Sequence, residues 1–338
     1  MKALVMNKPG EFAFEDRPKP VPKNDEVLFK VLQVGICGTD IHAFGGNQPF
    51  FDYPRVVGHE LVVEAAEIPP SAKDLKEGDI MTLVPYICCG ACIACRRGKT
   101  NCCINIKTLG VHIDGGMQEF LCVPAFFAVP AAGMKPMDIA LIECFAIGFH
   151  GVRRINPQRD EAALVVGTGP IGIGVIHGLK ERGVKVIAMD INEKRLKYAK
   201  EIAKADHLIN STDGDPEKAL GDIMGGELPL LVIDATGNAK QMMKAFGYVG
   251  AGGSIVYVGL VRDDISFHDP VLHAKEITLM GSRNATKEDF ANVMAGIKSG
   301  RVNTQGFITH TAKLDEVPAN FSSWAKPETG CIKAVVSL

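Results

Sequence analysis

Short apolar segments rich in β-branched residues recur through the first third of the chain, and glycine or proline interrupts them. Segments of this length and composition are typical of β-strands, and the glycines and prolines between them are typical of turns. We therefore expect a β-rich, barrel-like region with strands at residues 2–7, 25–35, 60–68, 79–86 and 118–124.

The pattern changes near residue 160, where short apolar strands alternate with segments that are mostly long enough to form a helix. In one such segment Leu196, Ala199 and either Ile202 or Ala203 form a single apolar stripe. The alternation predicts an α/β fold with a parallel sheet covered by helices on both faces. Its strands are expected at residues 162–167, 184–190, 228–237, 253–260 and 276–282.

The composition suits a large globular protein, since 46% of the 338 residues are hydrophobic. A formal net charge of −2 gives no general attraction to nucleic acid or to an anionic membrane. The first residues, MKALVMNKPG, do not resemble a secretion signal, and no apolar run reaches the roughly 18 residues that span a membrane. We therefore expect a cytoplasmic protein with neither a nucleic-acid nor a membrane partner.

A glycine-rich turn follows the strand expected at residues 162–167. Gly167, Gly169 and Gly172 match the G-x-G-x-x-G pattern at the start of an expected helix, whose free amides favour a bound pyrophosphate. Asp190 ends the next strand, at the spacing expected for an acid that binds the ribose hydroxyls of NAD. The negative charge of Asp190 favours NAD because it repels the 2′-phosphate of NADP, although Arg195 could offset part of that repulsion.

Six of the ten cysteines lie between Cys88 and Cys103. Cys89, Cys92, Cys95 and Cys103 have the close spacing with which four thiolates enclose one tetrahedral zinc ion and leave no position for substrate. The sequence favours this structural zinc site over a disulfide knot or a redox C-x-x-C motif, while an iron–sulfur cluster remains an alternative.

A second group of residues has the chemistry of an open metal site. Cys37, His59 and Glu60 offer the sulfur, nitrogen and oxygen ligands that zinc accepts together, and three protein ligands plus water are typical of catalytic zinc. Glu143 and Cys144 are adjacent in the chain, and both are candidates for the fourth position.

These motifs together resemble the zinc-dependent medium-chain alcohol and polyol dehydrogenases. The resemblance rests on GICGTDIH, GHE, the cysteine lobe, GVHIDGGMQEF and GTGPIG with its downstream acid, in that order. Glu143 before Cys144 resembles the sorbitol and threonine dehydrogenase branch. The resemblance implies a GroES-like catalytic domain, residues 1–147 and 284–338, and a Rossmann NAD-binding domain, residues 148–283. It also implies a dimer or tetramer.

The resemblance also implies roles for single residues. Cys37, His59 and Glu60 would bind the catalytic zinc, with Glu143 nearby, bound directly or through the zinc water. The alcohol dehydrogenase pattern would use Cys144 instead, and Glu143 is the favoured candidate for the fourth position. The substrate proton would leave through the Thr39 hydroxyl and pass by way of the nicotinamide ribose to His42 and solvent, while the hydride passes to NAD. Beside the residues named above, the NAD site would include Pro170, Ile171, Val258, Gly259, Leu260, Ser282 and Arg283.

The substrate is less certain from sequence. Asn47 and Gln48 lie near the expected zinc ligands and suit a substrate with several hydroxyls, while His112 and Asp114 are further candidates. This region and GSRNATKEDF are similar to bacterial hexonate 5-dehydrogenases, which oxidise L-galactonate, L-gulonate or L-idonate. A neutral polyol and L-threonine are the alternatives in this class. A zinc-ribbon nucleic-acid-binding protein and a zinc-free reductase are the less favoured readings.

Overall fold

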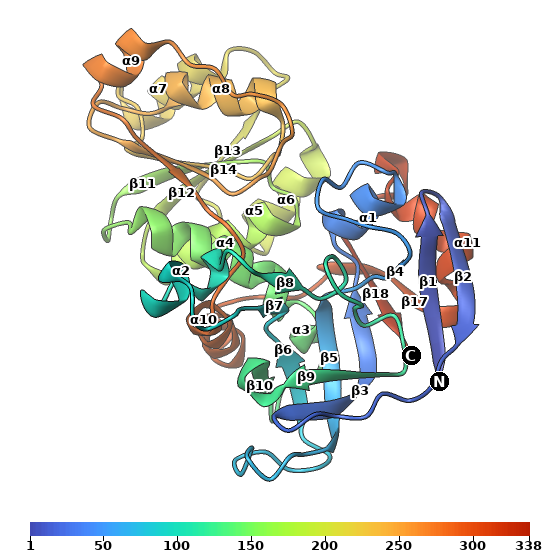
Figure 1. The fold of residues 1–338 in the computed structure, drawn as a ribbon. Helices are drawn as coiled ribbons and strands as arrows, with labels where there is room; N and C mark the ends of the chain where they lie inside the picture. Colours follow the sequence, from blue (N-terminus) through green and yellow to red (C-terminus); the bar gives the residue numbers. More distant parts are fainter. The chain divides into compact units, whose positions relative to one another are not determined.

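The chain folds into two compact units. The computed structural model describes residues 1–338, apart from the side chain of Pro327. The first unit contains residues Met1–Glu143, Ala285–Met294 and Thr304–Leu338, and the second contains Cys144–Asn284 and Ala295–Asn303 (Figure 1). The second unit begins at Cys144 and also takes in residues 295–303.

The first unit is built mainly from strands, as the sequence predicts. Its strands are β1 (Lys2–Lys8), β2 (Glu11–Asp16), β3 (Glu26–Gly35), β4 (Arg55–Val56), β5 (Glu60–Glu67), β6 (Ile80–Leu83), β7 (Tyr86–Ile87), β8 (Lys107–Thr108), β9 (Phe120–Pro124), β10 (Ala128–Pro130), β17 (Ile308–Lys313) and β18 (Lys333–Ser337). Its helices are α1 (Gly38–Phe44), α2 (Ile93–Arg96), α3 (Pro136–Ile139) and α11 (Val317–Trp324), with 3₁₀ turns at Thr100–Cys102, Ala125–Phe127, Leu314–Glu316 and Pro327–Thr329.

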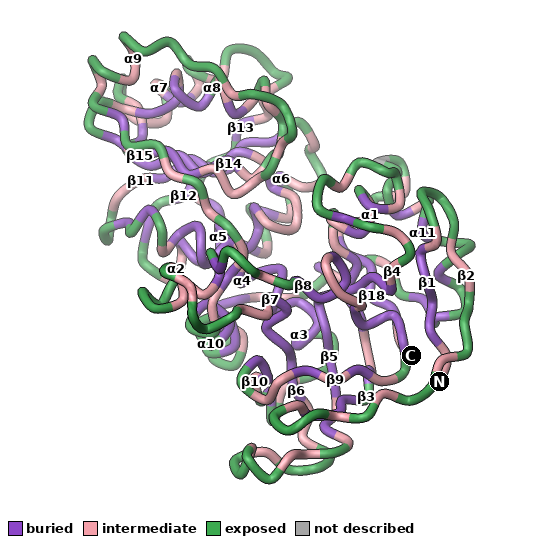
Figure 2. Tube along the Cα trace, viewed as in Figure 1, coloured by how far each residue is buried: buried purple, intermediate pink, exposed green. Residues whose placement is uncertain are grey.

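Three sheets form this unit. The largest has the order β10-β6-β5-β3-β18-β17, with β9 also paired to β3, and the others are β2-β1-β4 and β7-β8. Strand β3 is largely buried and pairs antiparallel with both β5 and β18. The C-terminal strand therefore lies beside a strand near the N-terminus, and Figure 2 shows buried backbone where they meet.

The second unit has alternating strands and helices. Its strands are β11 (Ala162–Val166), β12 (Lys185–Asp190), β13 (His207–Asn210), β14 (Leu231–Asp234), β15 (Ser254–Tyr257) and β16 (Thr278–Gly281). Its helices are α5 (Pro170–Glu181), α6 (Glu193–Glu201), α7 (Pro216–Met224), α8 (Ala239–Tyr248) and α9 (Asp269–Ala274). The strands pair in parallel in the order β13-β12-β11-β14-β15-β16, which is the strand order of a dinucleotide-binding Rossmann fold.

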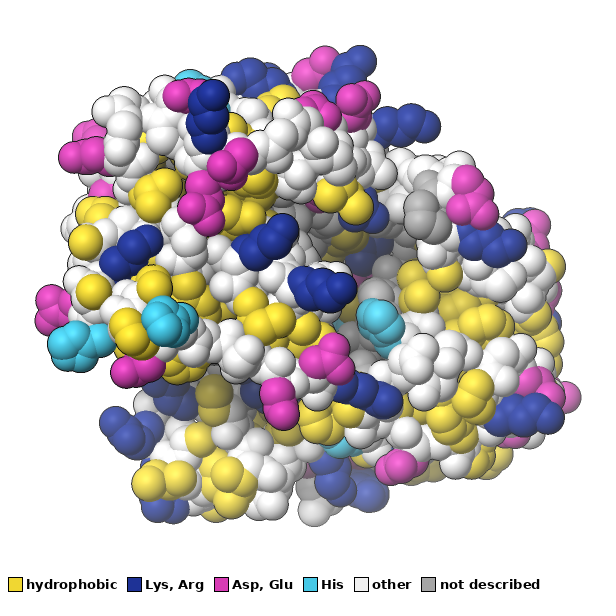
Figure 3. All heavy atoms as spheres, turned by 90° about the horizontal axis from the view of Figure 1, so that it is seen from above, with side chains coloured by type: hydrophobic (Ala, Val, Ile, Leu, Met, Phe, Trp, Pro, Cys, Tyr) yellow, Lys and Arg dark blue, Asp and Glu magenta, His cyan; other side chains and the backbone are white. Residues whose placement is uncertain are grey.

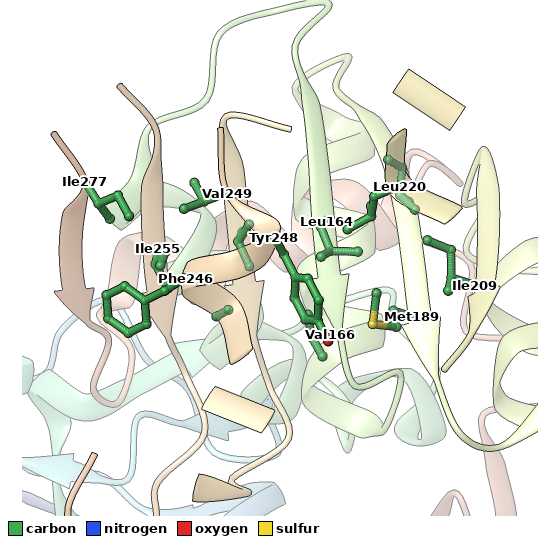
Figure 4. Close-up of a cluster of buried hydrophobic side chains, with 13 residues drawn as sticks. Leu164, Val166, Met189, Ile209, Leu220, Phe246, Tyr248, Val249, Ile255 and Ile277 are labelled. Carbon is green, nitrogen blue, oxygen red and sulfur yellow. The ribbon is translucent and has the colours of Figure 1, made fainter. Parts of the chain in front are cut away.

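The apolar strands of this unit are buried because helices cover the sheet. Leu164, Val166 and Met189 pack in a cluster with Phe246 and Tyr248 of α8 (Figure 4). Leu196 and Ala199 of α6 are also buried, so the apolar stripe expected there is confirmed. Strand β13 was not expected, because half of its four residues are exposed and its apolar pattern is weak.

Two helices explain where the units divide. Helix α4 (Ile142–Ile155) contains the boundary near its first turn, between Glu143 and Cys144. Helix α10 (Lys287–Lys298) begins in the first unit and ends in the second, where Arg301 donates a hydrogen bond of 2.8 Å to Glu181. Within the described part of the chain, no helix is both long and apolar enough to cross a membrane.

Candidate functional site

Three potential metal ligands meet in the first unit. Cys37 follows β3 and caps α1, while His59 and Glu60 stand at the start of β5. Sheet pairing places Gly35 opposite Glu60, so the end of β3 lies beside the start of β5. One ligand atom from each of Cys37, His59 and Glu60 lies within 4.8 Å of those of the other two.

Two glycines allow this close approach. A Cβ atom on Gly35 would lie 2.1 Å from Oε2 of Glu60, so a larger residue would push this carboxylate out of place. Gly58 has a φ of +97°, and a Cβ atom there would lie 2.5 Å from Cγ1 of Val34. The backbone before His59 therefore requires glycine both for its conformation and for space.

Asp40 holds the backbone around these ligands. Its buried carboxylate accepts hydrogen bonds from the N–H of Cys37 at 2.9 Å and from the N–H of Gly58 at 3.3 Å. Its Oδ1 atom is 3.8 Å from Nδ1 of His59, a buried nitrogen for which the structure records no hydrogen-bond partner. A carboxylate facing the second nitrogen of a metal-bound histidine is the usual arrangement around such ligands.

The electrostatics of the group favour a cation. Burial lowers the pKa of His59, but the negative charges of Cys37 and Asp40 outweigh burial and raise this pKa well above its usual range. A place that stabilises a protonated imidazole is one where positive charge is favourable. Sulfur, nitrogen and oxygen donors at this separation fit one zinc ion with three protein ligands and an open position.

A buried lysine, which the sequence analysis missed, contacts one of these ligands. Lys333 of β18 donates hydrogen bonds to both carboxylate oxygens of Glu60, at 2.6 and 2.7 Å, and to the carbonyl of Ile36 at 3.1 Å. The two side chains of this ion pair are 1% and 0% exposed. The single lysine in the apolar C-terminal strand was the one available signal, because unpaired lysines are rarely fully buried.

Glu143 lies close to the group but outside it. Its carboxylate is 2% exposed and accepts a hydrogen bond from the hydroxyl of Tyr86, a residue that the sequence analysis did not single out. Burial, reinforced by the charge of Glu60, raises the pKa of Glu143 to about 7. Burial and the charge of Glu143 likewise raise the pKa of Tyr86 well above its usual range.

Neither candidate for the fourth metal position joins the three-residue group. Glu143 and Cys144 are both buried, but the compact group contains only Cys37, His59 and Glu60. Cys144 belongs to the second unit. The assignment of the fourth position therefore stays a prediction.

The residues expected to move the proton lie on α1. Thr39 is half-buried and His42 is exposed, and a spacing of three residues places them on the same face of this helix. Their proton-transfer roles stay predictions.

Two of the residues expected near the substrate, His112 and Asp114, already form hydrogen bonds within the protein. Asp114 already accepts from Arg17 at 2.8 Å and from the N–H of Val56 at 3.0 Å, so its carboxylate is poorly suited to binding substrate. Nδ1 of His112 accepts from the N–H of Thr108 at 3.1 Å. Asn47 is exposed and Gln48 is half-buried.

The cysteine lobe forms a second compact group of ligands. Cys89, Cys92, Cys95 and Cys103 have sulfur atoms that all lie within 4.8 Å of one another. The Cys92–Cys95 and Cys89–Cys103 sulfur pairs are each 3.4 Å apart. Thiolates at about 2.3 Å from one zinc ion would be about 3.8 Å apart in a tetrahedron, so the group fits such an ion closely.

Backbone amides of the lobe stabilise a thiolate. Hydrogen bonds from the N–H groups of Cys95 and Ile104 lower the pKa of Cys92 to about 6. Thiolates are the form in which cysteine binds metals. The lobe therefore has the geometry of the structural zinc site that the sequence predicts, and Cys92 is favoured as a thiolate, whereas burial raises the pKa of Cys95 and of Cys103.

The glycine turn of the second unit leaves space for a ligand. Gly167 has a φ of +87°, and a Cβ atom on Gly172 would lie 1.8 Å from the carbonyl oxygen of Gly167. A Cβ atom on Gly169 would instead have only Arg195 within 4 Å, with its Nη1 atom at 3.8 Å. Gly169 caps helix α5, so its open side adjoins free helix amides.

Asp190 lies at the end of β12, beside this turn. Its Oδ2 atom accepts from the N–H of Thr168 at 2.6 Å and from its hydroxyl at 2.9 Å, and its Oδ1 atom accepts from the N–H of Asn192 at 2.9 Å. A carboxylate has about four acceptor sites, so Oδ1 retains capacity for one more donor. This geometry fits the predicted contact with a ribose hydroxyl.

The other predicted cofactor residues lie in the first turn of α5 and in the segments that follow β15 and β16. They are Pro170, Ile171, Val258, Gly259, Leu260, Ser282 and Arg283. A Cβ atom on Gly259 would lie 2.4 Å from the backbone nitrogen of Gly237, so the segment after β15 packs closely on the segment after β14. In parallel α/β sheets, ligands bind beyond the carboxyl ends of the strands, which is where these residues lie.

Comparison with known proteins agrees with both units. Residues 23–141 match the alcohol dehydrogenase GroES-like domain, and residues 170–299 match the zinc-binding dehydrogenase family. The chain is 43% identical over 310 residues to L-galactonate-5-dehydrogenase of Escherichia coli K12, covering 92% of this chain and 91% of that protein. It is 32% identical to L-threonine 3-dehydrogenase of Thermococcus kodakarensis, covering 98% and 96%.

Solved structures give the same result. The alcohol dehydrogenase RspB of E. coli CFT073, solved in complex with NADH, superimposes with a TM-score of 0.93 at 29% identity, covering 100% of this chain and 99% of that one. The family resemblance, the GroES-like and Rossmann folds and the enzyme class expected from sequence are thereby confirmed. The chain belongs to the zinc-binding medium-chain alcohol dehydrogenases, a family of oxidoreductases that act on a CH–OH group.

Proposed function

We propose that the protein oxidises a secondary hydroxyl of a hexonate, at carbon 5, and transfers the hydride to NAD. The observation that carries this proposal is the group of Cys37, His59 and Glu60, which fits an open zinc site in a chain of this family. The 43% identity to L-galactonate-5-dehydrogenase supports a sugar acid as substrate. The identity to an L-threonine dehydrogenase supports L-threonine as the alternative.

The metal ligands and the residues of α1 have separate tasks in the proposed reaction. Zinc bound by Cys37, His59 and Glu60 would act as a Lewis acid that lowers the pKa of the substrate hydroxyl. Asp40 keeps the backbone of Cys37 fixed and faces the second nitrogen of His59. The hydroxyl of Thr39 would accept the substrate proton while it passes its own proton on toward His42, and His42 would release a proton to solvent from the exposed face of α1.

The second unit would bind the cofactor. The open side of Gly169 accommodates the pyrophosphate, and Oδ1 of Asp190 accepts from a ribose hydroxyl. NAD supplies the hydride acceptor. Arg283 and Asn284 are proposed contacts for the substrate carboxylate.

Asp190→Asn is expected to weaken discrimination against NADP. The variant loses the negative charge that repels a 2′-phosphate, while Arg195 stays nearby to attract it. A change of about 1.5 kcal/mol, typical for one charged hydrogen bond, gives roughly a tenfold fall in the ratio of kcat/KM for NAD over NADP. Steady-state kinetics with both cofactors measure this ratio, and Asp213→Asn, an exposed acid of the same unit, should leave it unchanged.

The substrate assignment is tested with a panel of hexonates, pentitols, hexitols and L-threonine, each with NAD and with NADP. The proposal predicts the highest kcat/KM for a hexonate with NAD. A higher value for L-threonine or for a neutral polyol would replace the sugar acid with that substrate. Activity with none of them would remove the proposed substrate class.

A nucleic-acid-binding function is less well supported. Figure 3 shows Lys and Arg side chains interspersed with Asp and Glu on the face that it displays, instead of forming one basic stripe. We further propose that the protein works in a reducing compartment such as the cytoplasm, because its ten cysteines are all free of disulfides in the described chain. A dimer or tetramer is proposed on family resemblance and can be tested by sedimentation.

A further inference from the structure

Tyr86 connects the small β7-β8 sheet to Glu143. It begins β7, is 5% exposed, and donates its hydroxyl proton to Oε1 of Glu143. The two residues are separated by 57 positions in the sequence, so only the fold brings them together. Among the described residues, Tyr86 is the one side chain for which a hydrogen bond to Glu143 is recorded.

The rest of the tyrosine is also held in place. Tyr86 lines a cavity of about 230 Å³ together with Phe127 and Thr286 of the same unit. Tyr86 and Phe127 are 5% and 6% exposed, so both side chains are buried. A phenol anchored in this way has little freedom to release the carboxylate that it binds.

Glu143 has the position of a group that could close the metal site. Its carboxylate is buried in the same unit as the three ligands but lies outside their compact group. Glu60 is already inside that group and is bound by Lys333. A second carboxylate that was not held in place could therefore occupy the position that the substrate hydroxyl needs, since zinc readily takes a fourth carboxylate or thiolate ligand.

We propose that Tyr86 is a positioning residue that keeps Glu143 off the metal, so that the fourth coordination position stays available to the substrate hydroxyl. The hydrogen bond to Oε1 fixes the carboxylate and leaves Oε2 as the acceptor for a hydroxyl bound at that position. This inference rests on the proposed function of the metal group. Metal binding by Cys37, His59 and Glu60 does not require a hydrogen bond between Tyr86 and Glu143, and the proposal gives this hydrogen bond a function.

The test is Tyr86→Phe in protein whose open site is loaded with cobalt, which reports coordination through its visible absorption. With substrate and NAD absent, we expect the absorption spectrum to change and the cobalt to be lost to a chelator at least about tenfold more slowly, because Glu143 becomes a ligand. With the preferred substrate, kcat should fall about 10- to 100-fold. The spectral change should disappear in the double variant Tyr86→Phe, Glu143→Gln when it is compared with Glu143→Gln alone.

Tyr53→Phe is the matched control, because it removes a hydroxyl that donates to the carbonyl of Ala43 in the same unit. It should leave both the spectrum and the rate of cobalt loss unchanged. An unchanged spectrum in Tyr86→Phe would overturn the proposal, whatever happens to kcat, and so would faster loss of cobalt. The metal measurements need no substrate, so they remain decisive even if the hexonate assignment fails.

Discussion

Cys37→Ala is expected to lower kcat/KM on the order of a thousandfold and to remove about one of two zinc ions per chain. The variant leaves His59 and Glu60 as the remaining members of the three-residue group, and two protein ligands hold catalytic zinc poorly. Loss of Lewis-acid activation removes several kcal/mol of transition-state stabilisation, and about 4 kcal/mol corresponds to a thousandfold change in rate. Metal analysis and steady-state kinetics on the same preparation measure both effects.

Three other cysteines serve as controls for this prediction. Cys122→Ala changes a half-buried thiol of β9 outside both metal groups and should keep both zinc ions and the activity. Cys144→Ala should also keep both ions, whereas loss of one ion would make Cys144 the fourth ligand. Cys95→Ala should lose the other zinc ion and lower stability more than kcat. Full activity in Cys37→Ala would exclude the proposed metal site.

Lys333→Met is expected to destabilise the metal-free protein by about 3–5 kcal/mol. The substitution keeps a side chain of similar length but leaves the carboxylate of Glu60 buried without its cation. Added zinc should recover part of this loss, because the ion supplies positive charge at the same carboxylate. Urea denaturation with and without zinc measures the difference.

A variant of a surface ion pair and a double variant serve as controls for the stability of Lys333→Met. Lys8→Met breaks the exposed pair with Glu11 and should change stability by less than about 1 kcal/mol. The variant Lys333→Met, Glu60→Gln should be more stable than Lys333→Met alone, since no unpaired charge remains. Equal stability of Lys333→Met and the wild-type protein would show that the pair does not neutralise Glu60 in solution.

The sequence predicts most of the fold because apolar periodicity is local. The runs that became β11, β12, β14 and β15 were identified since strands covered on both faces must be almost wholly apolar. Strand β13 was not predicted, because its exposed residues weaken the pattern of apolar positions. The way α10 is shared between the two units could not be predicted, because it depends on contacts such as Arg301 with Glu181.

The candidate site divides in the same way. Cys37, His59, Glu60 and the four lobe cysteines were found because metal ligands have recognisable residue types and spacings. Lys333 and Tyr86 were missed because each acts through one partner, 273 and 57 positions away in the sequence. Residue types and spacings in the sequence predict which side chains would bind a metal. The groups that orient these side chains are identified only in the folded structure.

The most direct test of the central claim uses L-galactonate carrying deuterium at carbon 5, incubated with NAD and the zinc-loaded enzyme. The account predicts that the deuterium appears in NADH, that the reaction stops when a chelator removes the zinc, and that zinc restores it. NADH formed without deuterium, or deuterium transfer at an undiminished rate in zinc-free protein, would contradict the account.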